Sequence, residues 1–178
     1  HPLIENTGHL HADGGLIVLS AHAKDSLLTQ VLINDGLIQA DQIAEHEGNI
    51  ILSASGGDAW IDGHVQAHSG TINADADRLA IVGTLDTSGQ AEHKESGTIA
   101  LYAEDTLALA DGSLIQSNGY DNTDGGTILA LSGNTTLFRA ESSLNAKGGD
   151  EGGNGGFVEV SAPNHVLVQG QVNTSAAQ

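Results

Sequence analysis

Apolar and polar residues alternate in a short phrase that recurs along the chain. Clear copies begin at Gly15 (Gly-Leu-Ile-Val-Leu-Ser-Ala), Gly48 (Gly-Asn-Ile-Ile-Leu-Ser-Ala) and Gly97 (Gly-Thr-Ile-Ala-Leu-Tyr-Ala), and looser copies follow Gly126 and Gly156. A period of two behind a glycine is typical of a short strand that leaves a turn. Residues expected to face a core are Ile17/Leu19, Ile50/Leu52/Ala54, Ile72/Ala74/Ala76, Ile99/Leu101/Ala103 and Val158/Val160/Ala162.

Two further phrases lie within each repeat. One is a second apolar strand, with copies at Leu79-Ala-Ile81, Leu107-Ala-Leu109 and Val166-Leu-Val168, and less regular ones at Ala59-Trp-Ile61 and Leu137-Phe-Arg139. The other has the form glycine, any residue, aliphatic, polar, small. Its copies begin at Gly8, Gly36, Gly63, Gly83 and Gly170, and its core recurs in Ile115-Gln-Ser117 and Leu144-Asn-Ala146. The chain is therefore expected to be a stack of similar units, each with three short strands.

The spacing of the copies selects one architecture. The glycines that open the first phrase, Gly70 included, recur every 22 to 33 residues. Tandem hairpins would need tight two-residue turns at fixed places, and a helical solenoid would need long segments of period 3.6, and neither pattern occurs. We therefore expect residues 1–178 to form a single all-β unit, a parallel β-helix of about six coils without substantial α-helix.

Composition fits a stack of coils. Aromatic residues make up only 3% of the chain, as expected where inward side chains stack on their counterparts and large rings are hard to fit. Length variation is expected in the turns at 90–96 and 147–155. The copy of the first phrase at 126–133 carries one extra residue, which predicts a bulge there.

The strongly negative net charge of the chain excludes some classes of binding partner. A net charge of −18 repels phosphate backbones and anionic lipid, so neither nucleic-acid binding nor membrane insertion is expected. The acidic residues can be explained by the solubility that a long repeat protein requires. The alternative explanation is that the acidic turns bind calcium. The chain has no Cys, which excludes disulfides and thiolate sites, and no Met, from which we expect a piece of a larger protein.

Several segments together resemble a known family. They are Ala12-Asp-Gly-Gly-Leu-Ile-Val-Leu19, Gly48-Asn-Ile-Ile-Leu-Ser-Ala54, Gly152-Gly-Asn-Gly-Gly-Phe-Val-Glu-Val-Ser161 and Gln171-Val-Asn-Thr-Ser-Ala-Ala177. These segments are similar to the exoproteins of two-partner secretion in Gram-negative bacteria, which include filamentous-haemagglutinin-like adhesins, high-molecular-weight adhesins and haem-utilisation exoproteins. The similarity extends over nearly the whole chain.

The resemblance implies a right-handed parallel β-helix that an outer-membrane partner exports to the cell surface or the medium. It further implies a role in adhesion, haem acquisition or biofilm formation. The chain would belong to the passenger region that follows the secretion domain.

The polar residue of the third phrase is expected to stack into an outward column. Its members are His11, Gln39, Gln66, Asp86, Gln116, Asn145 and Asn173. Such a column could contact a glycan through its amides and carboxylate, or it could simply stabilise the stack through ladders of hydrogen bonds.

The sequence assigns no catalytic, cofactor or metal residue. His9 and His11 share one strand face, but no set of three converging ligands can be assembled from the nine histidines. Polysaccharide-cleaving sites need carboxylates on adjacent coils, whereas the column contains only Asp86. The closest acidic pair, Asp75 and Asp77, is expected in a solvated turn. No nucleophile elbow or phosphate-binding loop occurs.

The function expected is therefore non-enzymatic. We expect a segment of the β-helical shaft of a secreted or surface-exposed bacterial adhesin, with a host-cell or bacterial receptor or a glycan as partner. A polysaccharide-active enzyme and a module that captures haem or a haem carrier are the alternatives.

Overall fold

The computed structural model describes residues 1–23, 30–44 and 46–176. These residues form strands and turns, with no helix among them, and therefore none that could cross a bilayer. The strands are β1 (Ile4–Asn6), β2 (His9–His11), β3 (Leu16–His22), β4 (Gln30–Asn34), β5 (Leu37–Gln39), β6 (Asn49–Ile61), β7 (His64–Gln66), β8 (Thr71–Ile81), β9 (Thr84–Asp86), β10 (Thr98–Leu109), β11 (Leu114–Gln116), β12 (Thr127–Ser132), β13 (Thr135–Phe138), β14 (Ser143–Asn145), β15 (Phe157–Ser161), β16 (His165–Val168) and β17 (Gln171–Asn173).

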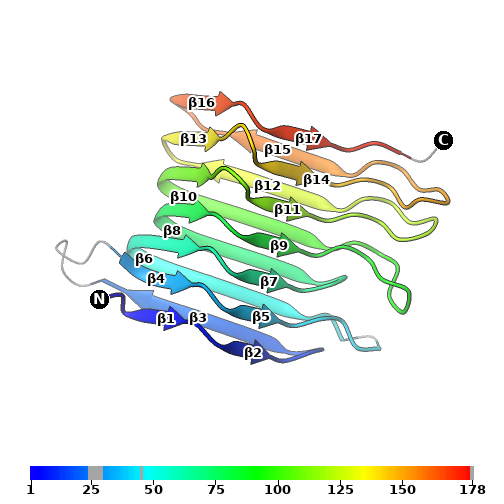
Figure 1. The fold of residues 1–178 in the computed structure, drawn as a ribbon, viewed down its shortest axis with the longest axis horizontal. Helices are drawn as coiled ribbons and strands as arrows, with labels where there is room; N and C mark the ends of the chain where they lie inside the picture. Colours follow the sequence, from blue (N-terminus) through cyan, green and yellow to red (C-terminus); the bar gives the residue numbers. More distant parts are fainter. Residues whose placement is uncertain (24–29, 45, 177–178) are drawn as a thin grey trace.

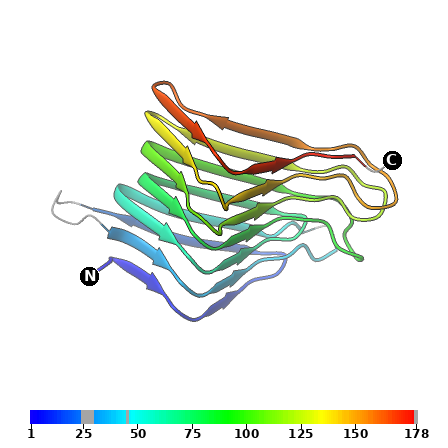
Figure 2. The ribbon, with the colours of Figure 1, turned by 45° about the horizontal axis from the view of Figure 1, so that its top comes forward.

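The strands pair in parallel with their counterparts one coil away. One sheet follows the order β1-β4-β6-β8-β10-β12-β15, with β3, β13 and β16 beside this path, and the other runs β17-β14-β11-β9-β7-β5-β2. Figure 1 shows the coils stacked between the two ends of the chain, and Figure 2 shows the same stack tilted. The expected parallel β-helix of about six coils is confirmed.

The first two phrases of each repeat share one sheet. They run together in β6, β8 and β10, where the register shifts between Ala54 and Asp58 and between Ala103 and Thr106 mark the bend. They separate into β12 and β13, and again into β15 and β16. The third phrase forms the seven short strands of the other sheet, and each strand ends at the polar residue of the phrase.

Two local predictions are wrong. The copy at 126–133 contains no bulge, because β12 pairs with both β10 and β15 without a register shift. The second phrase of that coil also lies one residue earlier than expected. Thr136 and Phe138 align with the inward Leu107 and Leu109, while Leu137 aligns with the outward Ala108. Two adjacent apolar residues, Leu137 and Phe138, leave the frame of a strand ambiguous in the sequence.

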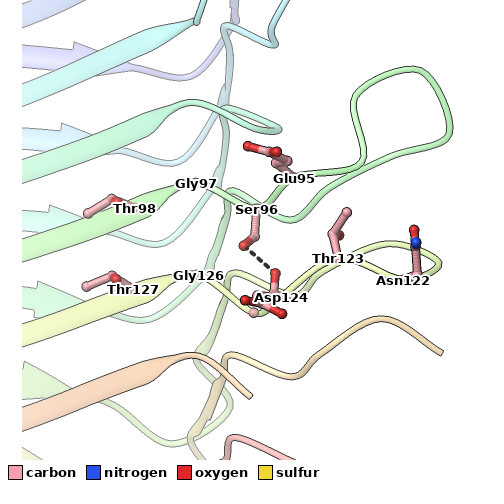
Figure 3. Close-up of a pocket in the computed structure, with 10 residues that line it drawn as sticks. Glu95, Ser96, Gly97, Thr98, Asn122, Thr123, Asp124, Gly126 and Thr127 are labelled. Carbon is pink, nitrogen blue, oxygen red and sulfur yellow. Dashed lines mark hydrogen bonds between the residues drawn. The ribbon is translucent and has the colours of Figure 1, made fainter. Parts of the chain in front are cut away.

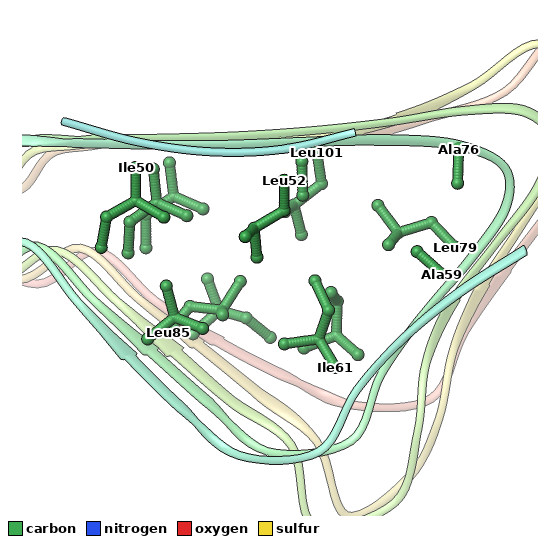
Figure 4. Packing of buried hydrophobic residues seen from close by; sticks show 14 of the residues in the cluster. Ile50, Leu52, Ala59, Ile61, Ala76, Leu79, Leu85 and Leu101 are labelled. Atoms are coloured by element: carbon green, nitrogen blue, oxygen red, sulfur yellow. The ribbon is translucent and has the colours of Figure 1, made fainter. Parts of the chain in front are cut away.

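The core consists of aliphatic side chains stacked from coil to coil. One such column is Ile17, Ile50, Ile72, Ile99, Ile128 and Val158, all in register. Figure 4 shows such side chains filling the space inside the coils. Phe138 is the exception to the aliphatic rule, since its ring is fully buried. Gly170 makes room for it: a Cβ at that position would lie 2.2 Å from the ring.

Glycine opens the first phrase because neighbouring coils approach too closely for a side chain. A Cβ at Gly70 would lie 2.2 Å from the carbonyl oxygen of Gly48, and one at Gly97 only 1.9 Å from that of Gly70. Gly126 and Gly156 meet the preceding glycine in the same way, at 2.2 and 2.1 Å. The glycine in the repeat is thus required by contact between coils rather than by an unusual backbone angle.

Candidate functional site

The polar residues of the third phrase form the column expected from the sequence. Each is the last residue of its strand, and strand pairing aligns His11, Gln39, Gln66, Asp86, Gln116, Asn145 and Asn173 in one continuous row. The five central members are half-buried, whereas His11 and Asn173 are exposed. A role in contacting glycan stays a prediction.

The three glutamine amides of this column donate hydrogen bonds within the protein. Nε2 of Gln39 and Nε2 of Gln66 each lie 2.9 Å from Oδ2 of Asp41. Nε2 of Gln116 lies 2.7 Å from Oδ2 of Asp86. Gln66 and Gln116 therefore bond across coils, whereas Gln39 bonds within its own coil to Asp41, a residue of the adjoining turn.

A histidine lies between two carboxylates where the column meets this turn. Nδ1 of His68 is 3.0 Å from Oδ1 of Asp41, and its Nε2 is 3.4 Å from Oδ2 of Asp86. The three side chains are largely buried, with exposed fractions of 12% for His68, 17% for Asp41 and 15% for Asp86. The side-chain amide of Gln90 also reaches Nδ1, at 2.7 Å.

Both partners of the His68–Asp86 contact have shifted pKa values. Burial alone would lower the pKa of His68, but the two neighbouring carboxylates outweigh burial and raise it. Burial would likewise raise the pKa of Asp86, but hydrogen bonds from His68, Ser88 and Gln116 lower it to about 2. At neutral pH Asp86 is therefore an ionised carboxylate held by donors, which suits a charged anchor better than a general acid.

A second polar column runs two residues beyond the first, in the turn. We call it the turn column, and it comprises Asp13, Asp41, His68, Ser88, Asn118 and Lys147. Its side-chain oxygens accept backbone N–H groups of the next coil, in the pairs Asp13 with Asp41 (3.0 Å), Asp41 with His68 (2.8 Å), Ser88 with Asn118 (3.0 Å) and Asn118 with Lys147 (3.0 Å). The series is interrupted at His68, whose side chain has no oxygen. The N–H of the next member, Ser88, donates to Oδ1 of Asp86, at 2.8 Å.

Sequence reasoning missed the turn column. Its signal was present, because each member follows the column residue by two positions with one small residue between them, as in Gln39-Ala-Asp41 and Gln116-Ser-Asn118. The residue types of the turn column differ from coil to coil. Their one common property, which most of them have, is a side chain that can accept a hydrogen bond. A chemical motif search does not detect a set defined in that way.

Two recesses adjoin this edge of the stack. One, of about 360 Å³, includes Asp13, Asp41, His68, Glu92 and His93 in its lining. Asp41 already accepts bonds from three residues, so its carboxylate is largely used within the protein.

The other recess lies between two successive turns and measures about 510 Å³ (Figure 3). Residues 95–98 and 122–127 line it, and Ser96 Oγ bridges the turns by donating to the carbonyl of Asp124 at 2.9 Å. Oδ1 of Asp124 also accepts the N–H of Asn154, at 2.6 Å. Ser96 and Asp124 thus hold neighbouring turns together.

Candidate metal ligands do not converge. Within the described ranges, no group of three or more His, Asp or Glu side chains is placed to hold an ion. The rings of His9 and His11 stack in parallel with centroids 5.9 Å apart, which matches their expected position on one strand face.

The closest acidic pair is not in a turn as predicted. Asp75 and Asp77 lie inside β8, where Asp75 accepts the hydroxyl of Ser53 at 2.7 Å and Asp77 accepts the N–H of Gly56 at 3.0 Å. Asp58 lies inside β6 and pairs with Arg78. All three carboxylates connect neighbouring coils. The turn predicted for Asp75 and Asp77 is wrong because strands here continue through a bend.

Comparison with known proteins adds no family assignment. No protein-family model matches the chain, and no curated protein matches it.

Proposed function

We propose that this chain is a segment of the β-helical shaft of a secreted or surface-exposed bacterial exoprotein that supports adhesion. Its role is to hold binding regions away from the cell, and its mechanism is mechanical rather than catalytic. The resemblance to two-partner-secretion exoproteins supplies the cellular setting, which includes an outer-membrane transporter during export and a receptor or glycan on a host or bacterial cell.

One observation supports this proposal above others: the polar residues of the stack bond to one another across coils. Gln39, Gln66 and Asp41 form one such connection, and Gln116 and Asp86 form the next. Side chains that are used in this way stiffen a rod and define its register. A shaft needs these two properties, whereas an enzyme needs unsatisfied groups aimed at a substrate.

The test removes one whole coil. Deletion of residues 98–126 joins Gly97 to Thr127, which occupies the position of Thr98 in the register, so every inward column remains continuous. If the segment serves as a spacer, cells that display the shortened protein keep their adhesion, and the rod shortens by about 4.8 Å. Loss of adhesion despite normal surface display would contradict the proposal.

A matched variant breaks the stack without shortening it. Ala100→Pro places proline in the middle of β10, which pairs on both sides, and therefore removes a ladder hydrogen bond. If folding outside the cell helps to draw the chain through its transporter, this variant stalls during secretion.

Two further assays test the alternative functions. Release of reducing ends from polysaccharide would favour the enzyme, and a haem absorbance shift on mixing would favour the haem-capture module.

A further inference from the structure

The bend of the large sheet contains an exposed indole beside a paired arginine. Trp60 lies on the outward face of β6 with 43% of its surface exposed, and it is the sole tryptophan of the chain. Its neighbours in register on the next two coils are Ala80 and Ala108. Two small residues beside a large ring leave a shallow apolar floor, which extends over two coils at about 4.8 Å each.

A polar row borders this floor. Arg78 donates from Nε and Nη2 to the two carboxylate oxygens of Asp58, at 2.8 and 2.7 Å. Its remaining nitrogen, Nη1, has no hydrogen-bond partner among the described residues. Thr106 lies next to Arg78 in register, and Asp105 lies at the bend. Together these groups and the floor line an open recess of about 470 Å³, which is within the size range of small-ligand sites.

The recess limits the chemistry of its occupant. An extended peptide docks by adding a strand to a free sheet edge, but β8, at the centre of the recess, pairs on both sides with β6 and β10, so its backbone has no free edge. A purely apolar ligand would bury the Arg78–Asp58 pair and Asp105 without compensation. An anionic ligand would meet two carboxylates against one guanidinium, in a chain of net charge −18.

We propose that this recess binds a neutral pyranose unit of a glycan. The apolar C–H face of the sugar packs on Trp60 and the alanine floor, as apolar groups pack on exposed aromatic rings. The hydroxyl groups of the sugar bond to Arg78, Thr106 and the carboxylates of the border. The site is separate from the third-strand column and does not depend on the shaft function, so either proposal can fail without the other.

Trp60 itself reports on this site, because no other indole contributes to the fluorescence. The intact chain is titrated with four neutral oligosaccharides, cellohexaose, maltohexaose, laminarihexaose and N-acetylchitohexaose, into the millimolar range. At least one produces a saturable change in tryptophan emission. Calorimetry then shows that Trp60→Ala weakens its binding by about tenfold or more, whereas Trp60→Phe retains part of it.

The matched control is Tyr102→Ala, since Tyr102 is an aromatic residue of similar exposure on β10, outside this recess. It binds as the unmodified chain does. Circular dichroism verifies that all variants keep the β-fold. Absence of a saturable response to all four sugars overturns the proposal, and so does binding that survives Trp60→Ala. A response to an apolar peptide but to none of the sugars overturns it as well.

Discussion

Oδ1 of Asp41 contacts His68 twice, at 2.8 Å from its backbone nitrogen and 3.0 Å from its ring Nδ1, across 27 residues of sequence. The first contact belongs to the turn column, which satisfies backbone N–H groups from coil to coil. The second contact places a titratable ring between Asp41 and Asp86. The Asp41 carboxylate thus both accepts a backbone hydrogen bond between coils and interacts with the titratable ring of His68.

His68 makes stability depend on pH on the alkaline side. Because its pKa is raised in the folded state, its contribution is fully present below the ordinary value of 6.5 and is lost as the pH rises through the folded-state pKa. The free energy of unfolding, measured by urea titration, should decline as the pH rises above about 6.5. The free energy of unfolding of the His68→Gln variant should decline less over the same pH range. His64→Gln, which alters an exposed histidine of the same coil, should follow the unmodified protein, and equal slopes for all three would refute this role.

Asp86 makes the stability of the protein depend on pH in the acid range. Its pKa of about 2 lies below the ordinary 3.8, so its contribution is present above about pH 4 and disappears as the pH falls toward 2. The shift corresponds to a contribution on the order of 2 kcal/mol at neutral pH. Asp86→Asn should therefore be less stable than the unmodified protein at pH 7 and nearly equal to it at pH 2. Asp35→Asn, at an exposed turn position, should show no such convergence.

The repeat allowed much of the fold to be predicted, because stacking imposes the same pattern on every coil. The third-phrase strands were predicted correctly, since the repeated order of an aliphatic, a polar and a small residue admits a single frame. The frame failed at Leu137 and Phe138, where adjacent apolar residues permit two choices, and only the pairing with Leu107 and Leu109 selects one of them.

The polar contacts could not be predicted in the same way. Asp41, His68 and Asp86 come from three coils, and the turns between them differ in length. A one-residue change in a turn would change which side chains meet. The Trp60 recess was missed for another reason: it depends on the small size of Ala80 and Ala108, which in the sequence are simply outward residues of a strand.

A buried hydroxyl without a partner offers a stabilising substitution. Ser113 is 1% exposed, and its Oγ is the one buried side-chain polar atom without a hydrogen bond in the described part of the chain. Ser113→Ala removes an uncompensated desolvation cost and should be neutral or stabilising by about 1 kcal/mol. Ser117→Ala is the matched control, because the Ser117 hydroxyl accepts from Thr87 at 2.9 Å and donates to the carbonyl of Gly97 at 2.8 Å. It should destabilise by about 1–3 kcal/mol. Equal effects in thermal denaturation would contradict the assignment.

Glycines that open the third phrase test the close approach of coils, since two of them differ in the space around them. A Cβ at Gly63 would lie 2.1 Å from the carbonyl oxygen of Gly36, whereas a Cβ at Gly8 would have its nearest neighbour, Oδ1 of Asn6, at 3.9 Å. Gly63→Ala must push two backbones apart and should cost about 3 kcal/mol in the free energy of unfolding. Gly8→Ala meets no such contact and should be neutral or stabilising by up to about 1 kcal/mol. Urea titrations of both variants measure the difference, and a Gly63→Ala protein as stable as Gly8→Ala would show that backbone contact does not require glycine there.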